Sequence, residues 1–99
     1  MNVVFSAAAK DDLLEIAIYI AQDNPPRALS FVDELENKCH ALVDVPAGGA
    51  TRPELGEGVR MVTHGRYLIF YRTNESAVRI ERIMHSARDI GSDDIEIDW

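Results

Sequence analysis

The chain has 99 residues, of which 46% are hydrophobic, so it is long enough for one packed domain and too hydrophobic for a disordered segment. Its formal net charge of −7 argues against tight, non-specific binding of nucleic acid, which needs many cationic contacts to phosphate. It has no long apolar run, no basic and apolar N-terminal signal and only one cysteine, so we expect a cytoplasmic protein without a membrane helix or an internal disulfide.

The first part of the sequence predicts a short strand followed by a helix. Residues 2–5 are typical of a strand, and Ser6 is a suitable N-cap for a helix that we expect from residue 7 to about residue 22. At helical spacing its apolar side chains form one stripe, made by Ala9, Leu13, Ile16, Ala17 and Ile20. We therefore expect one face of this helix to pack against the rest of the domain.

A second helix follows directly. Asp-Asn-Pro-Pro at residues 23–26 ends the first helix, and proline suits the first turn of the next one, which we expect from about Pro26 to Val43. Glu34 and Lys38 are spaced to form an ion pair on its polar face. Its apolar stripe consists of Ala28, Phe31, Val32, Leu35, Cys39 and Leu42, which makes Cys39 a core residue. The two stripes of such a helical hairpin need a common surface, and a sheet is the natural one.

The second half of the sequence predicts a loop and three strands. Residues 44–58 are rich in proline and glycine. Segments rich in β-branched and aromatic residues follow at 59–63, 67–73 and 77–84, and the short links between them suit hairpins. The middle strand is apolar on both faces, as in a sheet that is covered on both sides. The last strand has no single apolar face, so its core side cannot be assigned from the pattern.

The resulting order is β-α-α-β-β-β, which predicts an α+β fold with a helical hairpin packed on one face of a small antiparallel sheet. We expect residues 1–90 to form a single domain and residues 91–99 to form an acidic C-terminal tail. From Asp94 on, the tail alternates apolar and acidic residues, so it could extend the sheet, cover the core with Trp99 or remain loose.

The charges are divided unevenly along the chain. Residues 1–51 carry three basic and eight acidic side chains, and residues 89–99 carry five acidic side chains and no basic one. Between them, residues 52–88 carry seven arginines and four glutamates, a net charge of +3. This middle segment is the part of the chain suited to a local contact with an anionic partner.

Several short motifs occur in a fixed order along the chain. Ala-x-x-Asp-Leu-x-x-Ile-x-x-Tyr-Ile spans Ala9–Ile20, and Arg-Pro-Glu-Leu-Gly spans Arg52–Gly56. Gly-Arg-Tyr-Leu-Ile-Phe-Tyr-Arg then spans Gly65–Arg72, and His-Ser-Ala-Arg-Asp spans His85–Asp89. In this order and spacing, over roughly residues 3–90, the chain resembles the RelE/ParE superfamily of toxins from type II toxin–antitoxin systems. The second and fourth motifs resemble its ParE-like branch.

The resemblance implies the RelE/ParE toxin fold and a ParE-like toxin that inhibits DNA gyrase by binding rather than by catalysis. It implies a cognate antitoxin, ParD-like or similar, that neutralises the toxin in a hetero-oligomer. It implies no cofactor, no direct binding of nucleic acid by the toxin alone and no membrane. Two alternatives stay open: a RelE-like ribosome-dependent endoribonuclease that cuts mRNA, and a member of low toxicity that only forms the antitoxin complex.

For the nuclease alternative, RNA cleavage without a metal needs a base, a cation for the phosphorane and an acid for the leaving oxygen. Arg66, Arg72, His85 and Arg88 are the catalytic candidates, with Glu57 as a further one. Three features argue against this chemistry: the chain has only two lysines, it is acidic overall, and Ser86 and Ala87 stand where the nucleases usually have a base-stacking aromatic residue. One cysteine and three scattered histidines predict no metal site.

For a binding surface, the residues expected to contact the antitoxin or the target are Arg60, Arg66, Tyr67, Arg72 and Arg88. Some of the candidates also have a structural interpretation. Arg72 is expected to pair with a carboxylate on a neighbouring strand, and His85 to make a structural hydrogen bond. Arg88 and Asp89 are expected to fix the turn after the last strand. Arg66, in a hairpin link, is the residue most expected to touch a partner.

Overall fold

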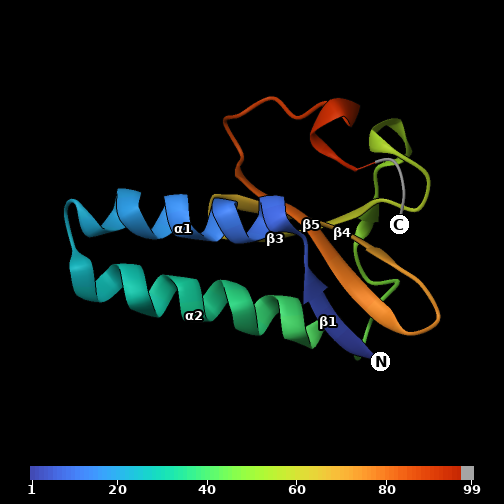
Figure 1. Ribbon diagram of the computed structural model, residues 1–99, viewed down its shortest axis with the longest axis horizontal. Helices are drawn as coiled ribbons and strands as arrows, with labels where there is room; N and C mark the ends of the chain where they lie inside the picture. The colour runs from blue at the N-terminus through green and yellow to red at the C-terminus, as the bar shows by residue number, and fades with distance from the viewer. Residues whose placement is uncertain (97–99) are drawn as a thin grey trace.

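The structure, a computed structural model, describes residues 1–96 as two helices on a five-stranded sheet (Figure 1). The elements are β1 (Asn2–Phe5), α1 (Ala7–Ala21), α2 (Pro25–Ala41), β2 (Ala50–Thr51), the 3₁₀ helix η1 (Pro53–Leu55), β3 (Arg60–His64), β4 (Tyr67–Thr73), β5 (Ala77–His85) and the 3₁₀ helix η2 (Ser92–Asp94). The α+β class is confirmed, and the predicted helices and strands are found with ends that differ by at most two residues. The predictions for Trp99 lie outside the described residues. Within residues 1–96, neither helix is long and apolar enough to cross a membrane.

The strand order across the sheet is β1-β5-β4-β3-β2. Strands β3, β4 and β5 form the predicted antiparallel meander, and β2 adds to it as a short antiparallel strand that the loop pattern did not predict. The first strand differs from the expectation because β1 lies parallel to β5. The sheet is therefore mixed. A parallel pair of strands needs a long connection, and the helical hairpin between β1 and the meander belongs to the connection that lets β1 pair in parallel with β5.

Both helices begin at side-chain caps. The Ser6 Oγ accepts a hydrogen bond from the Ala9 N–H at 3.0 Å, which confirms the predicted N-cap of α1, and the Asn24 Oδ1 caps α2 through the Arg27 N–H at 3.1 Å. The predicted Glu34–Lys38 pair is wrong, because both Glu34 carboxylate oxygens are used elsewhere. One binds Arg27 two turns earlier on the same helix, and the other lies 2.9 Å from the Nε2 of His64 on β3.

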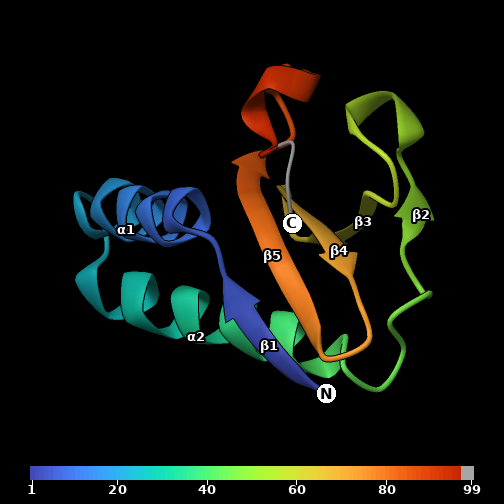
Figure 2. The same cartoon turned by 45° about the vertical axis from the view of Figure 1, so that its right-hand side comes forward.

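The sheet is covered on both faces, as the apolar pattern of β4 predicted. Helices α1 and α2 lie side by side against one face (Figure 2). The opposite face is covered by the segment around η1 and by the C-terminal segment around η2. The first core contains Ala9, Ile16, Phe31, Leu35, Cys39, Leu42, Ile69, Tyr71, Val78, Ile80 and Ile83, and the second contains Leu55, Val59, Phe70, Met84 and Ile95. Burial raises the pKa of the Cys39 thiol to about 12, as expected for the predicted core residue.

A bulge in β5 explains why its core face could not be assigned from the sequence. Tyr71 pairs with Ile80, but the preceding residue Phe70 pairs with Arg82, so Glu81 is an extra residue in β5. The extra residue shifts the alternation by one position. Ile80 and Ile83 therefore both reach the helix-covered core, although an uninterrupted strand would place them on opposite faces.

Candidate functional site

A small hollow of about 170 Å³ lies where the end of β5, the start of β4 and helix α1 meet. Three residues singled out from the sequence line it together, namely Tyr67, His85 and Arg88. Tyr67 and His85 are direct cross-strand partners, and their ring centroids are 5.3 Å apart in an edge-to-face arrangement. The meander thus brings side chains that are 18 residues apart in sequence into one surface.

Tyr67 packs against two other rings. Its ring lies 5.5 Å from that of Phe31 on α2, and His85 packs on it from β5. Burial raises the pKa of the Tyr67 phenol, and the nearby Tyr19 phenol adds to the rise. The hydroxyl therefore remains protonated at neutral pH, so it can donate as well as accept a hydrogen bond.

His85 makes the structural hydrogen bond that was predicted for it. Its Nδ1 lies 3.0 Å from the backbone N of Ala87 and accepts that N–H, which assigns the ring proton of the neutral form to Nε2. The Arg88 N–H donates to the His85 carbonyl at 3.0 Å, and the Ser86 N–H donates to the Arg66 carbonyl at 2.8 Å. These bonds fix the turn after β5 and tie it to the β3–β4 hairpin. Arg88 takes part through its backbone, whereas its side chain is exposed.

Arg88, which lines the hollow, and Arg66, which precedes Tyr67 in the chain, are both exposed. Arg66 follows Gly65 in the two-residue link between His64 and Tyr67, and the left-handed φ of 58° at Gly65 is one that glycine adopts readily. Within residues 1–96, no hydrogen bond or ion pair holds the guanidinium of Arg66 or Arg88. Both groups are therefore available to an anionic partner.

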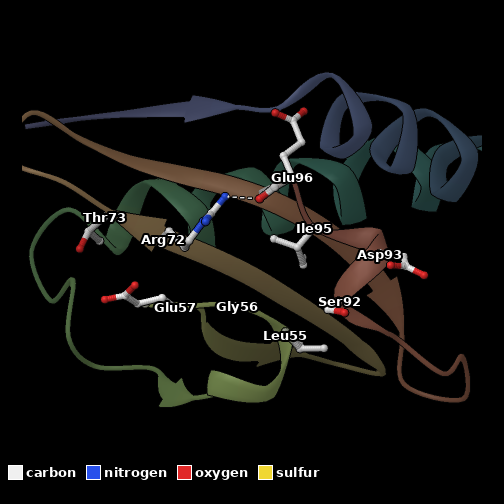
Figure 3. A pocket seen from close by; sticks show the side chains of 10 residues that line it. Leu55, Gly56, Glu57, Arg72, Thr73, Ser92, Asp93, Ile95 and Glu96 are labelled. Carbon is white, nitrogen blue, oxygen red and sulfur yellow. Dashed lines mark hydrogen bonds between the residues drawn. The ribbon is translucent and has the colours of Figure 1, made fainter. Parts of the chain in front are cut away.

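The other two predicted contact arginines are occupied inside the molecule. The Arg60 Nη1 donates to the Ala47 carbonyl at 3.2 Å and to the Gly49 carbonyl at 2.9 Å, and so holds the loop that precedes β2. The Arg72 Nε donates to the Glu81 carboxylate at 2.9 Å, which confirms the predicted pair with a carboxylate on a neighbouring strand. Arg72 lines a different, larger hollow on the second face of the sheet, together with Glu57 (Figure 3).

The side chains around this hollow can donate and accept hydrogen bonds and can pair with an anion. Glu57, the further candidate acid or base, does not line the hollow of His85. Within residues 1–96, no group of three His, Cys, Asp or Glu side chains is placed to bind a metal ion.

Sequence reasoning missed the contribution of α1 to this surface. Tyr19 and Glu15 line the hollow, and the Tyr19 side chain is 68% exposed. The sequence does contain a signal for Tyr19, because this aromatic residue lies off the apolar stripe that packs α1 on the sheet. A large aromatic residue outside the buried stripe is a candidate for a partner contact.

The fold is that of the ParE/RelE toxin superfamily. The structure is similar, with a TM-score of 0.74 and 26% identity over 86% of this chain and 95% of the other, to a chain of the chromosomal ParDE toxin–antitoxin system of P. aeruginosa. It is also similar, with a TM-score of 0.63 and 26% identity over 85% of this chain and 95% of the other, to a chain of the toxin–antitoxin complex RelBE2 from Mycobacterium tuberculosis. No curated protein matches the sequence.

The family model described as the ParE toxin of the type II toxin–antitoxin system parDE matches residues 3–90. The chain therefore belongs to the ParE toxin family and is a toxin of the type II class. This confirms the resemblance found in the sequence, including the extent over which it runs.

Proposed function

We propose that this toxin inhibits DNA gyrase by binding it, and that a cognate antitoxin neutralises the toxin by direct binding. The observation that carries the proposal is the match of the ParE toxin family over residues 3–90. Two exposed arginines support a binding surface rather than a catalytic centre: Arg88, which lines one hollow with the packed rings of Tyr67 and His85, and Arg66, which precedes Tyr67 in the chain. Aromatic and arginine side chains of this kind are enriched where binding energy is concentrated.

A supercoiling assay with purified gyrase tests the proposed target. We expect the toxin to inhibit supercoiling, and we expect Arg66→Ala and Arg88→Ala to require at least about tenfold more toxin for the same inhibition, because each removes an exposed cation from the contact. Lys38→Ala is the matched control, since it removes an exposed cation on α2, away from the hollow. An absence of inhibition at saturating, folded toxin would contradict the gyrase proposal.

The ribosome-dependent endoribonuclease is the second candidate, because Tyr67, His85 and Arg88 do meet around one hollow. Primer extension on mRNA after induction of the toxin separates the two functions. Discrete cuts within codons that disappear in His85→Ala or Arg66→Ala would favour the nuclease. Normal growth of cells that produce soluble toxin would instead favour the third alternative, a family member of low toxicity that only forms the antitoxin complex.

The antitoxin partner is supported by the similar chains, which come from a ParDE system and a RelBE2 complex. This chain offers apolar surface for such a partner on its helical hairpin, where Leu14, Ile18 and Leu29 are all more than half exposed. Leu14 and Ile18 are four residues apart on α1, so their exposed side chains form one apolar stripe. We expect the antitoxin to cover this stripe and its acidic residues to bind Arg66.

A further inference from the structure

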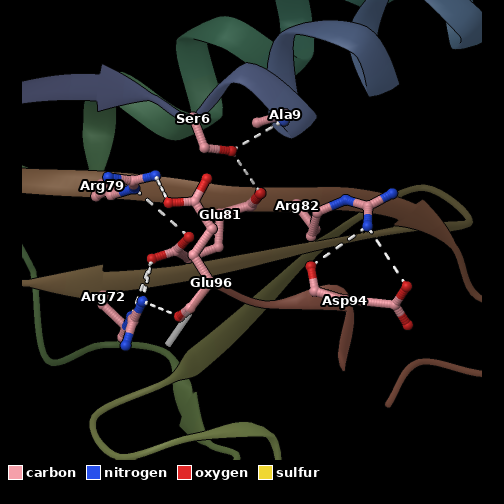
Figure 4. Close-up of polar contacts among 8 residues, drawn as sticks. All are labelled: Ser6, Ala9, Arg72, Arg79, Glu81, Arg82, Asp94 and Glu96. Atoms are coloured by element: carbon pink, nitrogen blue, oxygen red, sulfur yellow. Dashed lines mark hydrogen bonds and ion pairs between the residues drawn. The ribbon is translucent and has the colours of Figure 1, made fainter. Parts of the chain in front are cut away.

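The second face of the sheet carries a row of arginines that holds the C-terminal segment (Figure 4). Arg72, Arg79 and Arg82 come from β4 and β5, and each side chain is at most 16% exposed. They contact residues 92–96, which we call the clasp. The Arg79 Nη2 lies 2.8 Å from the Glu96 carboxylate, and the Arg82 Nη1 lies 3.5 Å from the Asp94 carboxylate.

The arginines recognise the backbone of the clasp as well as its carboxylates. The Arg72 Nη2 donates to the Glu96 carbonyl at 2.6 Å, and the Arg82 Nη1 donates to the Asp94 carbonyl at 3.3 Å. Contacts to carbonyl groups are available to any peptide, whatever its side chains. The row therefore has the donors needed to bind a peptide segment in general and an acidic one in particular.

Between the two acidic contacts lies an apolar socket. Ile95 is 5% exposed and packs with Leu55, Val59, Phe70 and Met84. Its backbone is extended, with φ −110° and ψ 133°, so the acidic residues on either side of Ile95 reach the arginine row. The clasp thus presents an acidic–apolar–acidic pattern in an extended conformation to a groove that complements each position.

The charges of the groove also favour an acidic occupant. The arginine row is compensated from within the fold by two buried carboxylates, Glu81 and Asp12, which leaves one positive charge in excess. Each arginine keeps a carboxylate from within the fold, because Glu81 lies 2.8 Å from Arg72 and 3.5 Å from Arg79, and Asp12 binds Arg82. Asp94 and Glu96 add two negative charges, which outweigh the one positive charge in excess. A neutral or basic segment would leave that excess charge of the poorly exposed row uncompensated, which is unfavourable.

The clasp is attached in a way that permits exchange. In the described part of the chain, no backbone–backbone hydrogen bond joins residues 92–96 to the sheet. Ile95 is the single buried side chain of the clasp, and Glu96 is 54% exposed at the side chain. A hollow of about 740 Å³ continues beside the clasp, lined by Leu55, Gly58 and Thr73 among others, so the groove is larger than the contact made by Ile95.

We propose that this groove is a binding site for an extended acidic–apolar–acidic segment of a partner protein, which binds by exchange with the clasp. The clasp occupies the site in the free toxin and acts as an intramolecular competitor. The inference does not depend on gyrase being the target.

A peptide titration followed by amide chemical shifts of the full-length chain tests the proposal. The probe is the peptide Ser-Asp-Asp-Ile-Glu-Ile-Asp, which repeats residues 92–98. We expect shifts at Leu55, Phe70 and Met84, and a dissociation constant at least about tenfold lower for Ile95→Ala than for the unaltered chain, because the variant weakens a competitor whose effective concentration is high. Glu96→Gln, which leaves the apolar core intact, is expected to act in the same direction with a smaller change.

Two controls separate site binding from general attraction. The neutral peptide Ser-Asn-Asn-Ile-Gln-Ile-Asn is expected to bind at least about tenfold more weakly, because it cannot pair with the arginines. Arg88→Gln, which removes a cation outside the groove, is expected to leave the dissociation constant unchanged. Equal affinity of the unaltered chain and both clasp variants, equal binding of the neutral peptide, or no shifts at the socket would each overturn the proposal. A dimer that exchanges residues 92–96 between two copies would make a second copy the occupant and overturn the partner assignment.

Discussion

Tyr71 and Gly49 fix the long loop between α2 and β3 to the core. The buried Tyr71 hydroxyl accepts the Gly49 N–H at 2.9 Å and donates to the Pro46 carbonyl at 2.9 Å. The contact depends on the absence of a side chain at Gly49, because a Cβ there would lie 2.6 Å from the Tyr71 hydroxyl oxygen and 2.9 Å from the Met61 carbonyl oxygen. The loop is thereby brought beside β3, where its residues Ala50 and Thr51 form β2.

We therefore predict that Gly49→Ala lowers the free energy of unfolding by about 1–3 kcal/mol, as is usual when a methyl group is forced into a packed site. The measurement is chemical denaturation followed by circular dichroism. Gly91→Ala is the matched control, because its added Cβ would meet no atom within 4 Å, and we expect a change of at most about 0.5 kcal/mol. Equal stability of the two variants would show that the backbone at Gly49 moves without cost.

At the scale of residues, position in the sheet separates the predicted contact arginines. Arg60 and Arg72 lie within strands, where neighbouring carbonyls and carboxylates are within reach, and both are bonded inside the molecule. Arg66 and Arg88 lie in turns and remain free. The Arg72 pair was predicted from the pairing of opposite charges across neighbouring strands, but the bond of Arg60 depends on how the loop folds back, which no local pattern encodes.

At the scale of elements, α1 is joined to β5 by a polar contact beside the apolar core. The Arg82 Nε and Nη2 bind the two Asp12 carboxylate oxygens at 2.8 and 2.9 Å, and the Ile83 N–H donates to the same carboxylate at 2.9 Å. The hydrogen bond to Asp12 is the main cause of the raised pKa of Arg82. Asp12 thus satisfies an edge N–H of β5 beyond the point where β1 ends.

Asp12→Ala is predicted to destabilise the fold by about 3 kcal/mol, because it leaves the Ile83 N–H without its acceptor and a largely buried guanidinium with only its longer contacts to Asp94. Thermal or urea denaturation measures the loss. Asp11→Ala removes a neighbouring exposed carboxylate and is expected to change the free energy of unfolding by no more than about 0.5 kcal/mol. A loss for Asp12→Ala no larger than that of Asp11→Ala would contradict this account of the contact.

The sequence contained a partial signal for this contact. Asp12 lies between Ala9 and Ile16 at helical spacing, on the apolar stripe of α1, and an acidic residue on such a stripe indicates a buried partner. Its partner could not be found from the sequence, because the bulge at Glu81 changes which residues of β5 share a face. Helices and strands were predictable from periodicity. The parallel pairing of β1 with β5 and the bulge in β5 depend on contacts between distant segments of the chain.

At the scale of the whole molecule, the net charge of residues 52–88 is a poor guide to the surface. Five of the seven arginines in this segment bind groups of the same chain, namely Arg52, Arg60, Arg72, Arg79 and Arg82. The free cations of the segment are therefore Arg88, which lines the hollow of Tyr67 and His85, and Arg66, which precedes Tyr67 in the chain. The charge pattern of the sequence suggested that the whole segment could contact an anionic partner. In the structure, only these two arginines remain free to do so.

The apolar stripe of Leu14 and Ile18 on α1 is then a second surface available to the proposed antitoxin. Leu14 and Ile18 are 60% and 56% exposed, and full burial of such a side chain contributes about 1.5–3 kcal/mol. We predict that Ile18→Asp weakens the complex with the antitoxin at least about tenfold, because it places a charge in the covered apolar contact. Leu14→Asp is expected to act in the same way.

Titration calorimetry with the purified antitoxin measures the dissociation constant, and the melting temperature of each free variant checks that the fold is intact. Val45→Asp is the matched control, because Val45 is 58% exposed but lies in the loop after α2 rather than on the stripe. Since all three positions are exposed in the free toxin, the substitutions should leave its stability nearly unchanged, so a weaker complex reports the contact itself. If Ile18→Asp and Val45→Asp bind the antitoxin equally well, the partner does not use this face of the hairpin, and the patch at Arg66 and Arg88 would have to carry the recognition.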